Sequence, residues 1–286
     1  MKTTTKKTRK KEAFTIIELL TVMSIIVILL GLLVPAMNKA KIYARTVNQR
    51  NQFHSIDVAL ELFKIEYEDY PPSDQFDDDT PADEYCGAMK LAEALVGQDL
   101  LGFHPDSVFH ADLRDASGIL LYYLSGQPSI ENLESRRGPY LTIDRANAYR
   151  LSNLFTAGQL STSVLPDRFV LCDEFSRVTN MGDEGPSRIG TPVLYYKADI
   201  SKFGNDSNEV IPNIYTYEDN SDLIDMGMPG SLISHLMSKS RFYSEIENPN
   251  INITYGRPYK PDSYILISAG PDGQYGTRDD IFNFEK

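Results

Sequence analysis

The sequence of 286 residues predicts an α+β protein in which one long N-terminal helix packs on a small antiparallel sheet. An unbroken apolar run opens this helix, and an apolar stripe at helical spacing continues it to about residue 68. The rest of the chain holds few strand-like runs, which lie far apart between short helical patterns and turn-rich stretches. This combination of elements is typical of the α+β class.

Residues 1–13 form a basic leader, in which six bases outnumber the single acid Glu12 and give a net charge of +5. Such a flank is expected on the cytoplasmic side of a membrane. Removal of the leader takes the formal net charge of the chain from −12 to −17. A domain this acidic is not expected to bind nucleic acid, because phosphate binding depends on clustered Lys and Arg.

Residues 14–36 are long and apolar enough to form a transmembrane helix. The segment has 23 residues, and Glu18 is its only charged residue. At the helical rise it is ~34 Å long, which is enough to cross the hydrocarbon of a bilayer. An ionised Glu inside lipid costs a few kcal/mol unless it has a partner. The freed α-amino group of a chain cut before Phe14 would be such a partner.

Residues 37–68 continue the helix in amphipathic form. Pro35 removes a backbone donor and is expected to kink or locally melt the helix near the junction. Beyond it an apolar stripe with steps of three and four predicts one buried face, and the helix should end before Pro71-Pro72. The stripe consists of Phe53, Ile56, Leu60, Phe63 and Tyr67.

The N-terminal segment resembles that of type IV pilins and type II secretion pseudopilins over roughly residues 7–66. With Phe14 as the first mature residue, Glu18 is the fifth, a hallmark of the family, and Pro35 is the twenty-second. The resemblance implies a pilin-like fold, cleavage by prepilin peptidase between Ala13 and Phe14, and N-methylation of Phe14. It also implies that Glu18 pairs with the Phe14 amine of a neighbouring subunit. Ala13 stands where the family usually has Gly.

Two other interpretations of the N-terminus are a Sec-type signal peptide and an ordinary signal anchor. A signal peptide has a shorter apolar core that ends in a small-residue cleavage site, and no such site follows here. A signal anchor would explain the length and the basic flank of the segment, but it would not explain Glu18.

Residues 69–286 are predicted to form one globular α+β domain. The acidic, proline-containing stretch 71–84 is expected to be a loop, and helices are expected over 87–101, closed by Gly102, and around 118–124. Strands are expected over 168–172, 192–197 and 263–268, and loops over 199–230 and 244–262. Cys86 and Cys172 are the only cysteines, and an oxidising compartment would allow a disulfide between them.

Residues 268–281 combine three carboxylates with three glycines after a predicted strand. Glycines let a tight turn direct its carbonyls inward, and hard oxygen ligands suit Ca²⁺. The spacing is not that of an EF-hand. The loop resembles the C-terminal calcium loop of the major pseudopilin, which implies Asp272 and Asp280 as ligands, Asp279 as a third, and carbonyls near Ile267 and Tyr275. A plain Asp-Gly turn with solvated acids is the alternative.

The sequence contains no H-E-x-x-H motif, no G-x-S-x-G motif and no P-loop, so an enzyme is not expected. The expected function is a structural, pseudopilin-like subunit of a type II secretion or type IV pilus-like filament. Its expected partners are copies of itself, other pseudopilins, prepilin peptidase and an inner-membrane assembly platform. The expected location is the inner membrane, with one span and a periplasmic domain. The alternative is a membrane-anchored binding or adhesion module that uses the helix only for export and display.

Overall fold

The computed structural model describes residues 15–74, 85–160, 165–176, 178–180, 187–251 and 254–286. The leader, Ala13 and Phe14 lie outside these residues. The chain divides into two compact units, residues 1–44 and residues 45–286. In the described residues the fold is mixed, with a long N-terminal helix and small antiparallel sheets, as the sequence predicts.

The N-terminal helix α1 spans Ile16–Tyr67 and is assigned as α-helix without interruption through Pro35. Of the two outcomes expected at Pro35, local melting therefore does not occur. In an ideal α-helix the ring of a proline meets the carbonyl four residues before it, which here is that of Gly31. The helix ends where Glu68 takes a left-handed conformation, with φ of 66°.

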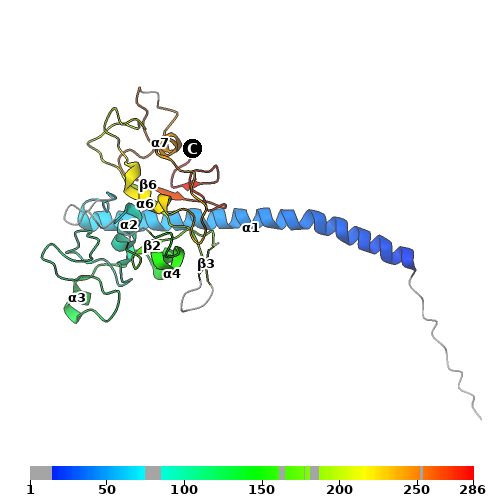
Figure 1. Cartoon of the computed structure of the whole chain (residues 1–286), viewed down its shortest axis with the longest axis horizontal. Coiled ribbons are helices and arrows are strands. Elements are labelled where there is room, and N and C mark those ends of the chain that lie inside the picture. The colour runs from blue at the N-terminus through cyan, green and yellow to red at the C-terminus, as the bar shows by residue number, and fades with distance from the viewer. Residues whose placement is uncertain (1–14, 75–84, 161–164, 177, 181–186, 252–253) are drawn as a thin grey trace, which may run out of the picture. The chain divides into compact units, whose positions relative to one another are not determined.

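Short helices and strands make up the rest of the second unit (Figure 1). The helices are α2 (Gly87–Val96), α3 (Ile130–Ser135), α4 (Ile143–Ala146), α5 (Leu151–Leu154), the 3-10 helix η1 (Tyr217–Asn220), α6 (Ser221–Asp225) and α7 (Lys239–Ile246). The strands are β1 (Ala148–Arg150), β2 (Phe169–Leu171), β3 (Val178–Asn180), β4 (Ser187–Ile189), β5 (Leu194–Lys197), β6 (Tyr264–Ser268) and β7 (Ile281–Phe282). In place of one small sheet, three are present: β1-β2, β3-β4 and β5-β6-β7, all antiparallel.

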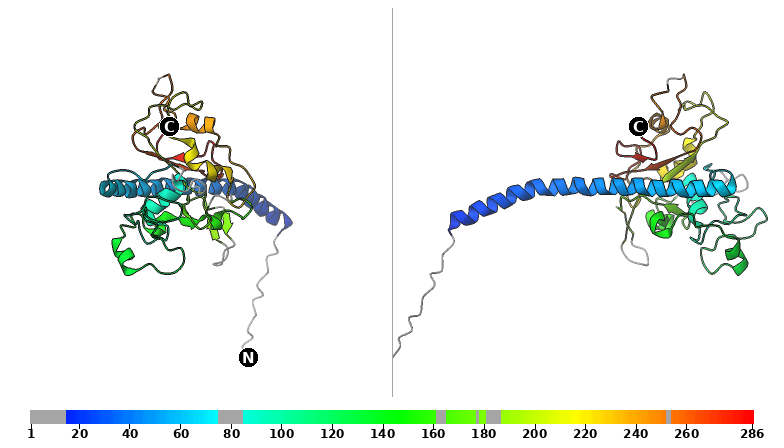
Figure 2. Two further views of the ribbon diagram at one scale, coloured as in Figure 1. Left: turned by 60° about the vertical axis from the view of Figure 1, so that its left-hand side comes forward. Right: turned by 180° about the vertical axis from the view of Figure 1, so that it is seen from behind.

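Strands β5 and β6 are buried on both faces because their side chains alternate between two core clusters. Tyr195 of β5 and its cross-strand partner Leu266 of β6 belong to the cluster that contains the stripe of α1, together with Leu95 of α2. Their neighbours Tyr196 and Ile265 belong to the cluster that contains Phe242 and Ile246 of α7. The two views of Figure 2 agree that α7 and the short helices α3 and α4 lie on opposite sides of the C-terminal part of α1.

The predicted apolar stripe on α1 is confirmed from Phe53 to Phe63. Its first four residues are at most 3% exposed, and Tyr67 at its end is partly buried. The stripe is extended by two glutamines that the hydrophobic pattern does not include. Gln49 is fully buried and Gln52 is 4% exposed.

The two buried glutamines hold α1 to the segment after β2 by directional hydrogen bonds. The Gln52 amide donates to the Cys172 carbonyl at 2.8 Å, and the Gln49 side-chain oxygen accepts from the Glu174 N–H at 2.8 Å. The Gln49 amide also donates to the Gln52 side-chain oxygen at 2.9 Å. Directional bonds of this kind fix the rotation of residues 45–67 on the domain more strictly than apolar contact alone.

Several predicted elements differ from the structure. The helix expected over 87–101 ends at Val96, because Gly97 takes a left-handed φ of 79° and closes it. No helix forms around 118–124, where Arg114 and Leu120 instead form an isolated antiparallel bridge. Helices η1, α6 and α7 lie in or beside stretches expected to be loops, since their apolar residues are too few to give a clear periodicity.

Cys86 and Cys172 are free, fully buried thiols, so the disulfide that their even number allowed is not formed. Cys86 precedes α2 as its N-cap residue, and Cys172 pairs with Pro192 in an isolated bridge at the end of β2. Burial raises the pKa of the Cys86 thiol to about 12. Burial also raises the pKa of Cys172 well above its usual range.

Candidate functional site

The first turn of α1 is closed by Thr15 and Glu18, which form a capping box. The Glu18 carboxylate oxygen Oε2 accepts from the Thr15 N–H at 2.9 Å and from the Thr15 hydroxyl at 2.6 Å. In return the Thr15 hydroxyl accepts from the Glu18 N–H at 3.3 Å. This reciprocal pattern satisfies donors that a helix N-terminus leaves free. The other oxygen, Oε1, accepts no hydrogen bond from the described residues.

The apolar first part of α1 has no partner among the described residues. The helix is long and apolar enough to cross a membrane, and the side chains of its most apolar stretch are exposed. Glu18 is the only charged residue between Thr15 and Pro35, and Pro35 lies within this exposed part. The structure is therefore consistent with a single span near the N-terminus.

A basic collar follows the span on α1. Between Leu19 and Ile56 the sequence has no acidic residue, yet it has four bases: Lys39, Lys41, Arg45 and Arg50. All four are exposed. Arg50 lies 3.7 Å from the Glu285 carboxylate, and the other three have no ion pair to a described residue. The collar therefore holds positive charge with no acidic residue of α1 within a turn of any of its four bases.

The 268–281 loop connects β6 to β7, which pair antiparallel with Ser268 opposite Ile281. Gly270, Gly273 and Gly276 have positive φ values of 57°, 77° and 83°. A Cβ atom on Gly270 would lie 1.8 Å from the Asp279 carbonyl oxygen, so no larger residue fits there without moving the backbone. The glycines thus let the loop fold back on itself, as the sequence predicts.

The three carboxylates of this loop bind its own backbone. Asp272 Oδ1 accepts from the Gln274 N–H at 2.8 Å, and Asp279 Oδ2 accepts from the Asp272 N–H at 2.9 Å. Asp280 Oδ2 accepts from the Gly276 N–H at 2.8 Å. Asp280 Oδ1 is buried and has no hydrogen-bond partner.

The environment of the loop disfavours negative charge. Burial raises the pKa of the Asp280 carboxyl to about 7, and the charges of Asp272 and Asp279 add to the shift. Burial and the neighbouring Asp279 also raise the pKa of Asp272. A cation bound among these carboxylates would oppose both effects.

The donor set suits a hard cation in its chemistry, although the side chains are not gathered into a ligand shell. Among the described residues, no group of three or more His, Cys, Asp or Glu side chains lies close enough together to hold a metal ion. The predicted carbonyl of Tyr275 accepts from the Leu236 N–H at 2.9 Å. The unpartnered Asp280 Oδ1 is the atom most in need of a ligand.

The loop is anchored to the segment that precedes α7. Besides the bond to the Tyr275 carbonyl, the Tyr275 N–H donates to His235 Nδ1 at 3.0 Å, and the Gln274 amide donates to the Ser234 carbonyl at 2.6 Å. Burial lowers the pKa of His235 to about 4, so this acceptor stays neutral at physiological pH. The anchor positions the loop independently of any metal.

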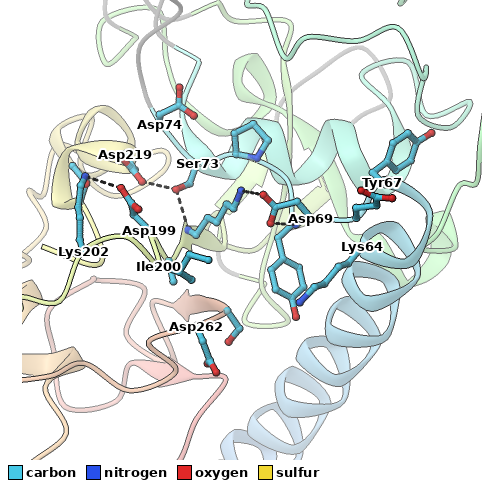
Figure 3. Close-up of a pocket in the computed structure, with 17 residues that line it drawn as sticks. Lys64, Tyr67, Asp69, Ser73, Asp74, Asp199, Ile200, Lys202, Asp219 and Asp262 are labelled. Carbon is cyan, nitrogen blue, oxygen red and sulfur yellow. Dashed lines mark hydrogen bonds and ion pairs between the residues drawn. The ribbon is translucent and has the colours of Figure 1, made fainter.

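A polar pocket of about 850 Å³ lies at the C-terminal end of α1 (Figure 3). Six carboxylates line it, from Glu68, Asp69, Asp74, Asp199, Asp219 and Asp262. Three lysines also line it: Lys64, Lys197 and Lys202. The pocket therefore has a net negative charge. Sequence analysis did not identify it, because its residues come from four segments that are far apart along the chain.

Hydrogen bonds across the floor of the pocket join its segments. The Ser73 hydroxyl donates to Asp219 Oδ2 at 2.5 Å and accepts from the Lys197 N–H at 2.9 Å. The Lys197 ammonium pairs with Asp69 at 2.5 Å, and Lys202 pairs with Asp199 at 3.1 Å. Burial raises the pKa of Asp219 to about 7, with further contributions from the charges of Asp74 and Glu218.

Besides the buried Asp219, two exposed carboxylates of the pocket have no ion pair with a described residue. They are Glu68 and Asp262. Ile200, which is 78% exposed, supplies apolar surface in the same pocket, whereas the buried Tyr70 ring is already covered by the Lys64 ammonium. Exposed carboxylates in a pocket that also has exposed apolar surface suit a Lys or Arg side chain, whose aliphatic stem packs while its charged end binds carboxylate.

Comparisons with protein-family models, with curated proteins and with solved structures found no match.

Proposed function

We propose that this protein is a structural, pseudopilin-like subunit of a type II secretion or type IV pilus-like filament. The observation that carries the proposal is α1. One uninterrupted helix exposes apolar side chains over its first part, buries an apolar stripe in the globular domain over its second, and carries a lone carboxylate in its first turn. A subunit that moves from a bilayer to a filament core needs such a helix, because both surroundings are apolar.

In this proposal the leader holds the precursor in the inner membrane until prepilin peptidase cuts between Ala13 and Phe14 and methylates the new amine. Glu18 then pairs with the Phe14 amine of a neighbouring copy. Its Oε2 is occupied by Thr15, and Oε1 is left to accept from that amine. A buried ion pair contributes register more than net stability. Other pseudopilins and an inner-membrane assembly platform are the further proposed partners.

We further propose that the 268–281 loop binds Ca²⁺ through Asp272, Asp279 and Asp280. Ca²⁺ would offset the charge repulsion that raises the pKa values of Asp272 and Asp280, and it would provide a partner for Asp280 Oδ1. The loop would then be stiffened next to β7, the last strand of the chain.

Intact-mass spectrometry of the protein recovered from membranes of its native host tests the proposal. The expected mass is that of a chain beginning at N-methylated Phe14. A full-length chain beginning at Met1 would contradict processing, and would leave a permanently anchored domain.

The alternative is a membrane-anchored binding or adhesion module with a periplasmic domain, and the pocket at the end of α1 favours it. Substitution Glu18→Ala separates the two functions. If the variant loses assembly while its amount in the membrane stays normal, the result supports the filament subunit. If the variant is displayed as well as the wild type, and the wild type itself forms no multimers, the result supports the binding module.

A further inference from the structure

We infer that the basic collar of one copy of this chain docks in the acidic pocket of a second copy. The inference rests on the proposed filament function, for which it names one contact between subunits. The cations that dock are Lys41 and Arg45, and the carboxylates that receive them are Glu68 and Asp262.

A partner of opposite charge would stabilise the collar, because its positive charges lie close together and repel one another. Lys41 and Arg45 are one turn apart, on the same side of α1. Like charges at this spacing repel one another by a few tenths of a kcal/mol. The first acidic residue after Glu18 is Asp57, about three turns beyond Arg45, so no acidic residue of α1 lies within a turn of Lys41 or Arg45.

The rest of the chain supplies the opposite charge in excess. Residues 1–50 contain ten bases and two acids and so have a net charge of +8. Since the whole chain has a net charge of −12, residues 51–286 have a net charge of −20. Within that acidic domain the pocket combines unpaired carboxylates with the exposed apolar side chain of Ile200. Ion pairs join Lys197 and Lys202 to Asp69 and Asp199, and the Lys64 ammonium lies over the Tyr70 ring, 4.2 Å from its centroid. None of the three lysines makes an ion pair with Glu68 or Asp262 among the described residues.

Collar and pocket lie at different positions along the chain, and this decides what kind of assembly their contact forms. Arg45 and Tyr67 are 22 residues apart on α1, or ~33 Å at the helical rise. A contact between two different surfaces is heterologous: each copy keeps a free collar and a free pocket, so further copies can add. The contact therefore builds an open row of copies and does not close a dimer. Neighbouring copies in the row are displaced from each other by ~33 Å along their helices.

An anionic membrane is the other surface that could attract the collar. The pocket favours the second copy because it offers unpaired carboxylates beside a place for aliphatic stems, whereas a domain of charge −20 is repelled by anionic headgroups. Exposed ion pairs contribute only ~0–1 kcal/mol each and weaken with salt. The contact therefore selects register between copies already gathered by their apolar helices.

Cysteine crosslinking in the full chain, in membranes of the native host, tests the contact. Asn48→Cys lies one turn from Arg45 on the collar side, and Ile200→Cys lies at the rim of the pocket; both retain every charge. The native Cys86 and Cys172 are fully buried and do not compete. We expect the double variant to form a ladder of multimers on mild oxidation, a mixture of the two single variants to form dimers alone, and each single variant to form neither.

Charge reversal gives the second arm of the test. Lys41→Glu with Arg45→Glu should reduce the crosslinked fraction at least ~5-fold, about 1 kcal/mol. Adding Glu68→Lys with Asp262→Lys should restore it. Arg188→Glu, an exposed base on β4, is the matched control and should leave the ladder unchanged.

The outcomes separate this inference from the proposed function. Filaments that assemble without any ladder would overturn the docking contact alone. A ladder insensitive to charge reversal, with collar variants that instead lose binding to phosphatidylglycerol vesicles, would also overturn it and assign the collar to the membrane. Absence of processed protein and of multimers in the wild type would overturn the proposed function, and this contact with it.

Discussion

Glu18 and Thr15 exchange hydrogen bonds at the start of α1, so the carboxylate has a local role before any neighbouring subunit is considered. A capping box contributes about 1 kcal/mol to the end of a helix. Loss of assembly in Glu18→Ala would therefore mix two causes, a frayed first turn and a missing charge.

Substitution Glu18→Gln separates these causes, because glutamine retains the capping oxygen and lacks the charge. We expect Glu18→Gln to lose filament assembly as fully as Glu18→Ala, measured as the sheared or pelleted fraction at equal membrane content. Thr15→Ala, which removes the cap and retains the charge, should assemble at roughly half the wild-type level or better. Wild-type assembly by Glu18→Gln would show that Glu18 acts only as a cap.

The loop carboxylates predict a calcium effect on stability. With Ca²⁺ at about ten times its dissociation constant, the folded state should gain about 1.4 kcal/mol. We expect a rise in Tm of the full chain in detergent, measured by near-UV circular dichroism at pH 8, that Asp280→Asn abolishes. Mg²⁺ should have little effect, since it requires a smaller octahedral site. Asp225→Asn, an exposed carboxylate outside the loop, should keep the full response.

Buried Asp219 predicts a stability that falls as pH rises. Its folded pKa of about 7 lies above its ordinary value of 3.8, so the folded state holds the proton more tightly. That contribution is fully present below the ordinary pKa and is lost as pH rises through about 7. Asp219→Asn keeps an oxygen that accepts from Ser73 but does not titrate. The Tm of this variant relative to wild type should therefore be about 3 °C higher at pH 8 than at pH 5. An equal offset at both pH values would contradict the assignment.

Gln52 should matter for stability although it is polar. Gln52→Leu leaves the Cys172 carbonyl without its donor inside the core, which costs about 1–3 kcal/mol in the free energy of unfolding. Asn51→Ala, on the exposed side of the same turn, should change it by less than about 0.5 kcal/mol. Denaturant titration of both variants in detergent checks the difference. Equal effects would mean that the bond to Cys172 contributes nothing.

The two thiols should be chemically silent in the folded protein. Burial and raised pKa values leave almost no accessible thiolate on Cys86 or Cys172. We expect no alkylation by iodoacetamide under native conditions, and two alkylations after denaturation without reductant, read by mass spectrometry. Protein that requires a reductant before it can be alkylated would instead contain a disulfide.

Periodicity predicted those parts of the fold in which apolar residues repeat. The stripe from Phe53 to Phe63, the buried strands β5 and β6 and the turn glycines of the 268–281 loop were readable in this way. Gln49 and Gln52 were not, because a polar residue in a core is recognised only by its partner across the fold. The calcium, filament and membrane assignments stay predictions that the experiments above test.

The pocket could not be predicted from the sequence for a related reason. Its acidic residues read as separate loop positions, and only the meeting of β5 and η1 with the C-terminal end of α1 gathers them. The capping box corresponds to the T-x-x-E pattern Thr15-Ile16-Ile17-Glu18, but a carboxylate inside an apolar segment also indicates a membrane or assembly role, so the pattern alone does not identify the cap.

The close approach of Gly270 to the Asp279 carbonyl has a consequence for how this loop can change during evolution. A side chain at position 270 would collide with backbone, so the glycine is required by the path of the chain whether or not a cation binds. The carboxylates at 272 and 280 accept backbone hydrogen bonds that an amide oxygen could also accept, so only the proposed cation would require their charge. In an alignment of relatives, glycine retained at 270 while the residues at 272 and 280 lose their charge would argue against the proposed calcium site, and joint retention of glycine and acids would support it.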